Sequence, residues 1–461
     1  MWTDVVYVIL LFLCVAVGVF YQKIEDPHVK KWTCTIIGFA LVIIVSGSHL
    51  LHPLIVTLIN AFIITKLPPK KCHLASFFFS FFYLLFILRL GEYVGLPAPP
   101  GYTNLIVMIL ILKLSGLAFE VNSATNPPFD DVQGVDSKAM ADIGFMDVFH
   151  YAYSYMGLLT GPYYRYRTYW DHLNRPFGKY MDVMPLTVYK LKQSVCYIVL
   201  FLLMNHLYPL RYIITEEFGQ RSFLYRHLYM YPAFIVFKLR MYVGMTLAEC
   251  ACQMAGLGAY PARCSPAQGL GPRDYKTTVA LSTSPEKLKE EEFNFETIHN
   301  MDVWKLETSI STRAAMKAWN GCIQYWMGVY VYKRFPYKSL RTIATLTLSA
   351  VWHGWAPGYF FCICQIPLFL LSEDIFLKIY KQMKEDSLAK KALWMLLWYE
   401  RTTCMAYLGM PFMLLDFYDS IHYYKVAYCS GHFIALLLYI VARYLQPRVP
   451  RSCIEGKDKD K

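Results

Sequence analysis

His353 lies in a mostly apolar stretch, LSAVWHGWAPGYF at 348–360, between Trp352 and Trp355. An ionisable side chain inside a membrane segment is costly unless it faces a cavity or a partner. Imidazole has an ordinary pKa of about 6.5, and its neutral form can accept a proton from an alcohol. The position marks His353 as a candidate general base, beside the common alternative of a buried histidine that only bonds a backbone carbonyl.

Asn320 lies 33 residues before His353, in the aromatic-rich stretch AWNGCIQYWM at 318–327. The pattern predicts that this stretch is helical. An asparagine amide can donate to a developing oxyanion or fix a reacting hydroxyl. Order and spacing therefore single out this pair among the other histidines in or beside apolar stretches, which are His49, His52, His150, His206, His422 and His432.

The composition is typical of an integral membrane protein. Of the 461 residues, 56% are hydrophobic and 17% charged, against roughly 25% charged in ordinary soluble chains. The net charge of +12 is expected on cytosolic loops, so it predicts no nucleic-acid partner. The thirteen cysteines include Cys-x-Cys pairs but none with the Cys-x-x-Cys spacing of zinc or redox sites. No metal site and no disulfide framework are predicted.

The apolar runs predict an all-α, polytopic transmembrane helix bundle of about 11 spans. A helix needs about 20 mostly apolar residues to cross a bilayer. The candidate spans are 5–21, 35–51, 53–65, 74–90, 102–119, 193–210, 228–248, 341–357, 358–372, 402–415 and 426–442. We expect residues 1–461 to form a single integral-membrane domain.

Loop charges predict the orientation of the chain. Lys-rich loops after the first and third spans place the N-terminus in the lumen and the C-terminus in the cytosol. Residues 260–300 are predicted to be a polar cytosolic loop, and 446–461 a cytosolic charged tail. The terminal KDKDK resembles a Lys-x-Lys-x-x retrieval signal of the endoplasmic reticulum membrane; the alternative is a solvated charged tail.

The pair Trp319-Asn320…Trp326 and Trp352-His353-Gly354 resembles the motifs of the membrane-bound O-acyltransferase family. The stretches at 160–169, 248–261, 295–302 and 349–360 are similar to its lysophospholipid branch that acylates lysophosphatidylinositol and prefers an arachidonoyl donor. The resemblance implies an acyl-CoA-dependent enzyme of phospholipid remodelling. It would transfer a polyunsaturated chain, arachidonoyl, to the sn-2 hydroxyl of lysophosphatidylinositol and give phosphatidylinositol, inside a membrane-embedded catalytic chamber. Acyl-CoA is then a co-substrate, and no cofactor is implied.

The resemblance carries the catalytic roles onto His353 and Asn320. The candidates for substrate binding are Trp319, Trp326, Trp352, Tyr163, Tyr164, Arg165, Arg167, Lys333 and Arg334. Lys333 and Arg334 are basic residues that would meet the phosphates of coenzyme A, or simply mark the cytosolic side. The aromatic and basic run at 163–167 would hold the lipid head group, or anchor the chain at the interface. Glu120 and Glu249 end apolar runs and are assigned no role.

Three alternatives stay open. The first is another acceptor within the same family: another lysophospholipid, a sterol or diacylglycerol, or a protein serine. A transporter would place a histidine on an ion path, with membrane-embedded carboxylates and paired broken helices. A scaffold that has lost the chemistry is disfavoured by the intact Asn320 and His353. The predicted partners are acyl-CoA, lysophosphatidylinositol and membrane lipids, and the sequence does not identify a protein partner.

Overall fold

The computed structural model describes residues 2–91, 95, 97–125 and 142–446. These residues are mostly helical, with four two-residue strands, which confirms the predicted all-α class. The chain divides into two compact units. Unit 1 comprises residues 1–199, 240–301 and 320–354, and unit 2 comprises 200–239, 302–319 and 355–461. Of the predicted tail, residues 447–461 lie outside the described residues.

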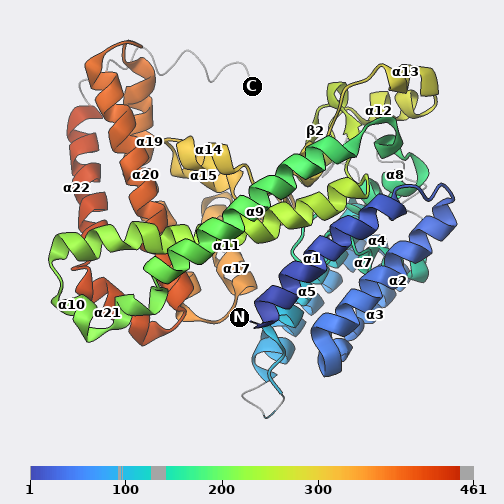
Figure 1. Ribbon diagram of the computed structural model, residues 1–461, viewed down its shortest axis with the longest axis horizontal. Helices are drawn as coiled ribbons and strands as arrows, with labels where there is room; N and C mark the ends of the chain where they lie inside the picture. Colours follow the sequence, from blue (N-terminus) through green and yellow to red (C-terminus); the bar gives the residue numbers. More distant parts are fainter. Residues whose placement is uncertain (1, 92–94, 96, 126–141, 447–461) are drawn as a thin grey trace. The chain divides into compact units, whose positions relative to one another are not determined.

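Unit 1 begins with helices that pack side by side (Figure 1). Asp26 starts the second of them, because its carboxylate accepts a hydrogen bond from Val29 N at 2.7 Å and Pro27 follows at the first helical position. The elements are α1 (Trp2–Tyr21), α2 (Pro27–Ser46), η1 (Gly47–Leu50), α3 (Leu51–Lys66), α4 (Pro69–Phe82), the π-helical η2 (Tyr83–Arg89), α5 (Gly101–Thr125), α7 (Phe145–Ala152), α8 (Tyr166–Asn174) and η4 (Phe177–Tyr180).

Helix α5 is the interior helix of unit 1. It is apolar on all sides, and 89% of its most apolar 18-residue window is buried. A helix that is hydrophobic all round belongs in a core or a membrane. Helices α2, α3, α4, α7 and α8 and segment η2 all pack against it. The polar side chains that α5 carries are therefore held inside the unit, where each needs a partner.

Residues 260–300, predicted as a polar loop, fold into short elements within unit 1. β1 (Tyr260–Pro261) pairs antiparallel with β4 (Phe293–Asn294), and β2 (Pro266–Ala267) pairs with β3 (Gly271–Pro272). The helical turns are η6 (Ala262–Cys264), α12 (Tyr275–Ser282), α13 (Pro285–Lys289) and η7 (Glu296–Ile298). Its cytosolic location stays a prediction.

The remaining elements of unit 1 carry the two candidate catalytic residues. They are α16 (Gly321–Trp326), the π-helical η8 (Met327–Tyr332), η9 (Lys338–Leu340) and α17 (Arg341–His353). α17 packs against both π-helical segments, η8 and η2. π-Helical turns are rare and are frequent at functional sites.

Unit 2 is also helical. Its elements are η5 (Leu210–Ile214), α10 (Glu216–Gln220), α14 (Val303–Thr308), α15 (Thr312–Ala318), α18 (Pro357–Ile363), α19 (Ile366–Gln382), α20 (Leu388–Leu414), α21 (Phe417–Val426) and α22 (Ser430–Leu445). Helices α9 (Val183–Leu207) and α11 (Phe223–Met254) each contribute residues to both units. The core of unit 2 is rich in tyrosine, including Tyr407, Tyr423 and Tyr424.

The chain is a multi-pass membrane protein. Among the described residues, six helical segments are long and apolar enough to cross a bilayer, or seven if one pair bent by 61° counts as a span. They are Thr3–Tyr21, Pro27–Lys66, Pro69–Arg89, Gly101–Ala124, Val183–Ile214 and Pro357–Gln382, with the pair Phe417–Val426 and Ser430–Leu445. About 11 spans were predicted, but 35–51 and 53–65 fall in one 40-residue segment, and the run from 341 ends after 13 residues at His353.

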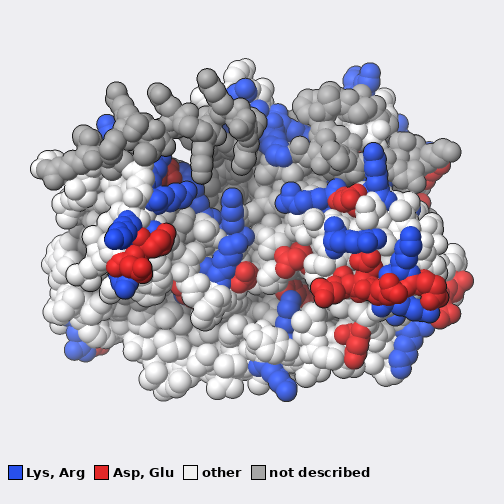
Figure 2. Space-filling view, turned by 90° about the horizontal axis from the view of Figure 1, so that it is seen from above, with Lys and Arg blue, Asp and Glu red and all other residues white. Residues whose placement is uncertain are grey.

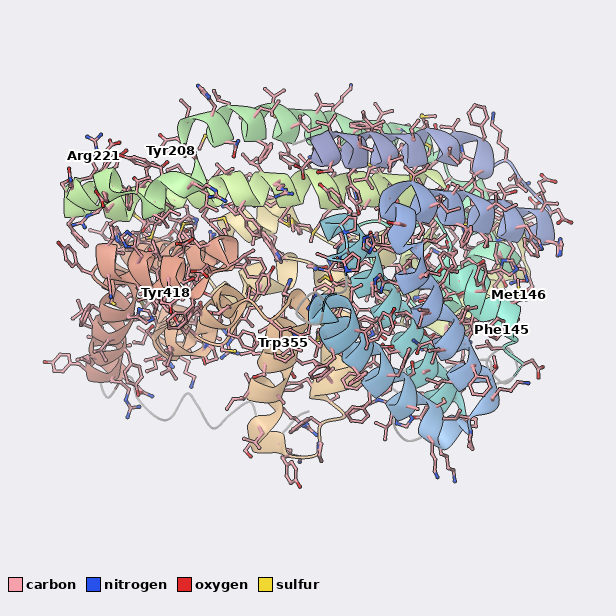
Figure 3. The ribbon with its side chains drawn as sticks, turned by 90° about the horizontal axis from the view of Figure 1, so that it is seen from below. Phe145, Met146, Tyr208, Arg221, Trp355 and Tyr418 are labelled. Atoms are coloured by element: carbon pink, nitrogen blue, oxygen red, sulfur yellow. The ribbon has the colours of Figure 1, made fainter. Side chains whose placement is uncertain are left out.

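The surface agrees with a membrane environment. Large areas of the face in Figure 2 carry neither Lys, Arg, Asp nor Glu. Large apolar side chains are exposed on several helices, for example Phe145 and Met146 at the start of α7, 41% and 46% exposed (Figure 3). Lipid would cover such side chains without a cost in free energy.

Candidate active site

Asn320 lies at a turn and not inside a helix as the aromatic pattern had predicted. It is the residue before α16, and its backbone is left-handed, with φ 54° and ψ 50°. Asparagine tolerates this conformation better than other non-glycine residues. Its carbonyl oxygen accepts from Ile323 N and Gln324 N, both at 3.1 Å, and so starts the helix. The turn fixes the direction in which the side chain leaves the backbone.

The amide of Asn320 takes no part in capping the helix that it precedes. An asparagine in this position usually accepts from the second or third amide of the helix, with an extended backbone. Here no such side-chain bond forms. Asn320 Oδ1 is buried and has no hydrogen-bond partner among the described residues. A buried acceptor left unpaired costs about 1–3 kcal/mol, so this oxygen is suited to receive a hydrogen bond from a substrate.

His353 is the last residue of α17, which ends where the predicted span was to continue. Its ring lies 4.8 Å from the ring of Trp352, nearly edge to face. Arg89, at the end of η2, donates to the carbonyl oxygens of Val351 at 2.9 Å and Trp352 at 2.6 Å. The last carbonyls of a helix lack partners within it. The guanidinium satisfies two of them and holds the turn that carries the imidazole.

Helix α5 connects the two motif segments. Trp326 Nε1 donates to the carbonyl oxygen of Leu112 at 3.0 Å, and Trp352 Nε1 donates to that of Met108 at 3.2 Å. Both indoles are buried. The two carbonyls are four residues apart, about 6 Å along the helix axis. Each can accept a second hydrogen bond because a carbonyl oxygen has two lone pairs. The segments of Asn320 and His353 are thus attached to one rigid helix.

The aromatic and basic run at 163–167, predicted to hold the lipid head group or to anchor the chain at the interface, is buried in unit 1. Tyr163 and Tyr164 are fully buried, and Arg165 and Arg167 are 3% and 5% exposed. Arg165 pairs with Glu120 of α5 at 3.2 Å. Arg167 stacks on Tyr275, 3.8 Å from the ring centre. Tyr164 bonds within the unit through its hydroxyl, which donates to the Met156 carbonyl at 2.7 Å.

The remaining predicted residues are Arg334, Lys333 and Trp319, and Arg334 bonds to α5. Arg334 donates to Asn122 Oδ1 at 3.0 Å and to Ser123 Oγ at 2.6 Å, both near the end of α5. Lys333, beside it, is exposed. Trp319 belongs to unit 2, where its ring stacks on Phe237 with centres 6.0 Å apart. Unit 1 therefore brings together Asn320, Trp326, Trp352, His353 and Arg334 around α5 and the elements packed on it.

Sequence reasoning missed three residues that support the site. Arg89, a basic residue within the apolar run 74–90, holds the end of α17. Asn300 bonds the first amides of α16: Gly321 N donates to its carbonyl oxygen at 2.7 Å, and Cys322 N to its Oδ1 at 3.2 Å. Glu249, which was assigned no role, accepts from the amide of Asn300. The signal for Arg89 and Glu249 was a charge at the end of an apolar helix; Asn300 carried none.

The cluster around Glu249 includes a histidine outside the membrane-spanning segments. His299 Nδ1 lies 3.3 Å from Glu249 Oε2. Burial lowers the pKa of His299, but the hydrogen bond and charge of Glu249 outweigh it and raise the pKa above its ordinary value. Among the described residues, no three His, Cys, Asp or Glu side chains gather as a possible metal site.

Comparison with known proteins agrees with these features. Residues 131–415 match MBOAT, the membrane-bound O-acyltransferase family. The chain is 38% identical over 447 residues to the Drosophila melanogaster protein named membrane-bound acylglycerophosphatidylinositol O-acyltransferase frj, covering 93% of this chain and 90% of that protein. It is 34% identical to the human protein named membrane-bound acylglycerophosphatidylinositol O-acyltransferase MBOAT7, covering 94% and 92%. The Xenopus laevis protein of the same name is also 34% identical, covering 96% and 94%. The matched region includes Asn320 and His353, and the chain belongs to the membrane-bound O-acyltransferase family.

Proposed function

We propose that this chain transfers an acyl group, arachidonoyl, from coenzyme A to the sn-2 hydroxyl of lysophosphatidylinositol. The product is phosphatidylinositol, and the reaction remodels phospholipids in the endoplasmic reticulum membrane, with the C-terminus of the enzyme in the cytosol. The choice of acceptor is supported by three relatives over more than nine tenths of the chain, whose names specify an acylglycerophosphatidylinositol acceptor. The arachidonoyl preference rests on the resemblance of the motif stretches.

One structural observation carries the mechanism. Asn320 has a buried amide oxygen without a partner among the described residues, on a segment tied to the same helix as the turn of His353. An acceptor suits the hydroxyl of a lysophospholipid, which can donate its hydrogen. Asn320 Oδ1 would hold this hydroxyl as it enters. When the single hydroxyl hydrogen turns to His353, the amide nitrogen of Asn320 would donate to the tetrahedral oxyanion.

The proposed reaction needs no covalent enzyme intermediate. Neutral His353 accepts the hydroxyl proton as the oxygen attacks the thioester carbonyl. The tetrahedral intermediate collapses and the carbon–sulfur bond breaks. The departing thiolate takes the proton from His353, which leaves the new ester, free coenzyme A and a neutral imidazole. Holding both substrates in one geometry makes the step effectively unimolecular and lowers the barrier by several kcal/mol, up to about 7–11.

The four basic candidate residues differ in how accessible they are to a substrate. Exposed Lys333 and the adjacent Arg334 are proposed to meet the phosphates of coenzyme A. Arg165 and Arg167 lie inside unit 1, so they can meet a head group only if it enters the unit. Their present partners, Glu120 and Tyr275, give both a structural function as well.

The first test is an acyl-transfer assay on purified protein in detergent. Arachidonoyl-CoA and saturated acyl-CoA are each offered with lysophospholipids that carry inositol, choline, ethanolamine or serine. We expect product from lysophosphatidylinositol and faster transfer of arachidonoyl. His353→Ala should lower kcat by about 10²–10⁴-fold, the usual contribution of a general base. His206→Ala, a histidine exposed on α9, serves as the control with unchanged activity.

Each part of the proposal fails in its own way. Transfer to another head group would replace the acceptor and keep the chemistry. Equal rates with all acyl chains would remove the arachidonoyl preference. A fully active His353→Ala variant that folds normally would overturn the assignment of the general base.

A further inference from the structure

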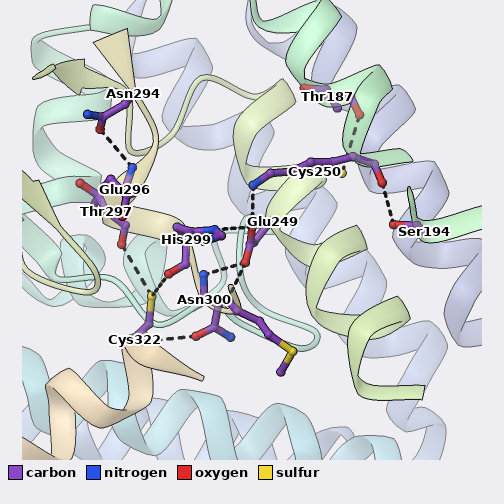
Figure 4. A network of polar contacts seen from close by, with 12 residues as sticks. Thr187, Ser194, Glu249, Cys250, Asn294, Glu296, Thr297, His299, Asn300 and Cys322 are labelled. Atoms are coloured by element: carbon purple, nitrogen blue, oxygen red, sulfur yellow. Dashed lines mark hydrogen bonds and ion pairs between the residues drawn. The ribbon is translucent and has the colours of Figure 1, made fainter. Parts of the chain in front are cut away.

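Glu249 is buried within unit 1 in the last two turns of α11, and its carboxylate has four donors around it (Figure 4). Oε1 accepts from the backbone amides of Asn300 at 2.6 Å and Met301 at 3.0 Å. Oε2 accepts from Lys190 Nζ at 2.6 Å and lies 3.3 Å from His299 Nδ1. A buried carboxylate is tolerated when it is paired and hydrogen-bonded in this way. The carboxylate fixes the backbone at 300 and 301.

The fixed backbone at Asn300 in turn holds the beginning of α16. The first amides of a helix have no partner within it. Here the first, Gly321 N, donates to Asn300 O at 2.7 Å, and the second, Cys322 N, donates to Asn300 Oδ1 at 3.2 Å. Cys322 Sγ adds contacts to the carbonyl oxygens of Thr297 and His299 at 3.7 and 3.8 Å. Asn300 therefore does the work that a capping side chain would do.

This arrangement has a consequence for Asn320. Its side chain would be the natural cap of α16, bonding the second or third amide. Asn300 Oδ1 already satisfies the second, Cys322 N, and the carbonyl oxygen of Asn320 itself accepts from the third, Ile323 N. The residues that follow Asn320 hold its left-handed backbone in place, through the bonds that its carbonyl oxygen accepts. Its Oδ1 has no partner among the described residues. The cap of α16 comes from Asn300, in another part of the chain, and the side-chain amide of Asn320 is not used as a cap.

We infer that Glu249 and Asn300 are positioning residues, which cap α16 from outside and so leave the Asn320 amide available to the substrate. The inference rests on the function proposed for Asn320. Glu249 Oε1 bonds the Asn300 amide, and Asn300 bonds the amides of Gly321 and Cys322. These bonds position Asn320, the residue that directly precedes Gly321. Neither positioning residue needs to touch the substrate.

The test is kinetic and compares kcat with KM. Glu249→Ala and Asn300→Ala should lower kcat by about 10–100-fold with little change in KM, since a misplacement of about 1 Å can cost 10²-fold in rate. Asn300→Asp keeps an acceptor oxygen for Cys322 N and should retain most of the activity. Glu249→Gln combined with Lys190→Met keeps the acceptor for the amides and removes the stranded cation. It should also be largely active and covers the case in which Glu249→Ala fails to fold.

A double-mutant cycle separates positioning from stability. In an Asn320→Gly background, Glu249→Ala should have no further effect on kcat, because the amide that it positions is gone. If Asn320→Gly leaves too little activity for the cycle, the comparison of kcat and KM for the single variants decides. Asp171→Asn is the matched control. Asp171 is another fully buried carboxylate in unit 1, bonded by Tyr260 and Tyr275 at 2.9 and 3.0 Å, and it should lower thermal stability without changing kcat.

The outcomes distinguish this inference from the proposed function. Full activity of Asn320→Gly would overturn the function of Asn320 itself. An inactive Asn320→Gly with normal kcat in folded Glu249→Ala and Asn300→Ala would overturn the positioning only. Additive effects in the cycle, or a loss confined to melting temperature as for Asp171→Asn, would also reduce Glu249 to a structural residue.

Discussion

Trp326 and Trp352 donate their indole N–H groups to two carbonyls one turn apart on the same helix, α5. One tryptophan lies six residues after Asn320, and the other directly precedes His353. The two motifs are far apart in sequence, yet each is fastened to the same rigid, buried element. The geometry of the candidate site depends on how closely these indoles approach α5.

Gly116 allows this approach. A Cβ at this position of α5 would lie 2.6 Å from Tyr163 Oη and 3.2 Å from Trp326 Nε1. Gly116→Ala should therefore push Trp326 away from the helix and lower both the melting temperature and kcat, at a cost of about 1–3 kcal/mol for overpacking. Gly328→Ala is the control, because nothing lies within 4 Å of its added Cβ. Equal behaviour of the two variants would show that the approach of Trp326 does not matter.

The left-handed turn at Asn320 predicts different effects for two deletions of its side chain. Glycine adopts φ 54° freely, whereas alanine is strained there by about 1–2 kcal/mol. Both variants should lose acyl transfer because both lack the amide. Only Asn320→Ala should also lose thermal stability relative to Asn320→Gly. Differential scanning fluorimetry in detergent makes the comparison, and equal melting temperatures would speak against the observed backbone.

Arg89 should be required for activity although it lies outside both motifs. Arg89→Met removes the donors to Val351 and Trp352, so the last turn of α17 loses its cap and His353 its fixed position. We expect kcat to fall by about 10-fold or more. Arg89→Lys should recover part of the activity, because lysine restores a charge but not the fork of two donors.

Arg313→Met is the matched control for Arg89. Arg313 forms an exposed ion pair with Asp374 in unit 2, at 2.8 Å, and such pairs contribute little. Its removal should leave kcat unchanged. If Arg89→Met behaves like Arg313→Met in the assay, the end of α17 is held by other contacts.

His299 should make stability depend on pH. Its pKa is raised in the folded chain by Glu249, against the opposing effect of burial. A raised pKa means that the folded state binds the proton more tightly than the unfolded state. The stabilisation is present below the ordinary value of about 6.5 and is lost as the pH rises through the folded value.

The measurement compares melting temperatures of wild type and His299→Asn between pH 5 and 9. Asparagine keeps a neutral donor toward Glu249 but cannot take the charge. The difference in favour of wild type should be largest at low pH and shrink as the pH rises. A difference that is constant, or that grows with pH, would contradict the charged pair.

The sequence by itself determined the class of the protein. Long apolar runs can only be buried in lipid or in a protein core, so the all-α membrane architecture follows from composition and run length. The sequence also proposed the two candidate catalytic residues, because an asparagine and a histidine at this spacing among tryptophans resemble the motifs of the family. The match of residues 131–415 to the family agrees with that interpretation.

Tertiary structure decided where the helices end and what the polar residues do. The predicted spans 35–51 and 53–65 fall in α2, η1 and α3, which follow one another without a break as the helical segment Pro27–Lys66. The tyrosine and arginine run at 163–167 was predicted to hold the lipid head group or to anchor the chain at the interface, and Arg165 pairs with Glu120 inside unit 1. Pairing over long sequence separations cannot be read from local composition.

The release of the Asn320 amide is the clearest case. Local sequence places an asparagine before a helix, and its usual function there would be to cap it. Only the folded chain brings Asn300 to the same amides and Glu249 to Asn300. A backbone hydrogen bond between distant segments leaves no trace in the types of the residues it joins. The sequence therefore identifies Asn320 as a candidate, and only the tertiary structure shows that its amide is not used as a cap.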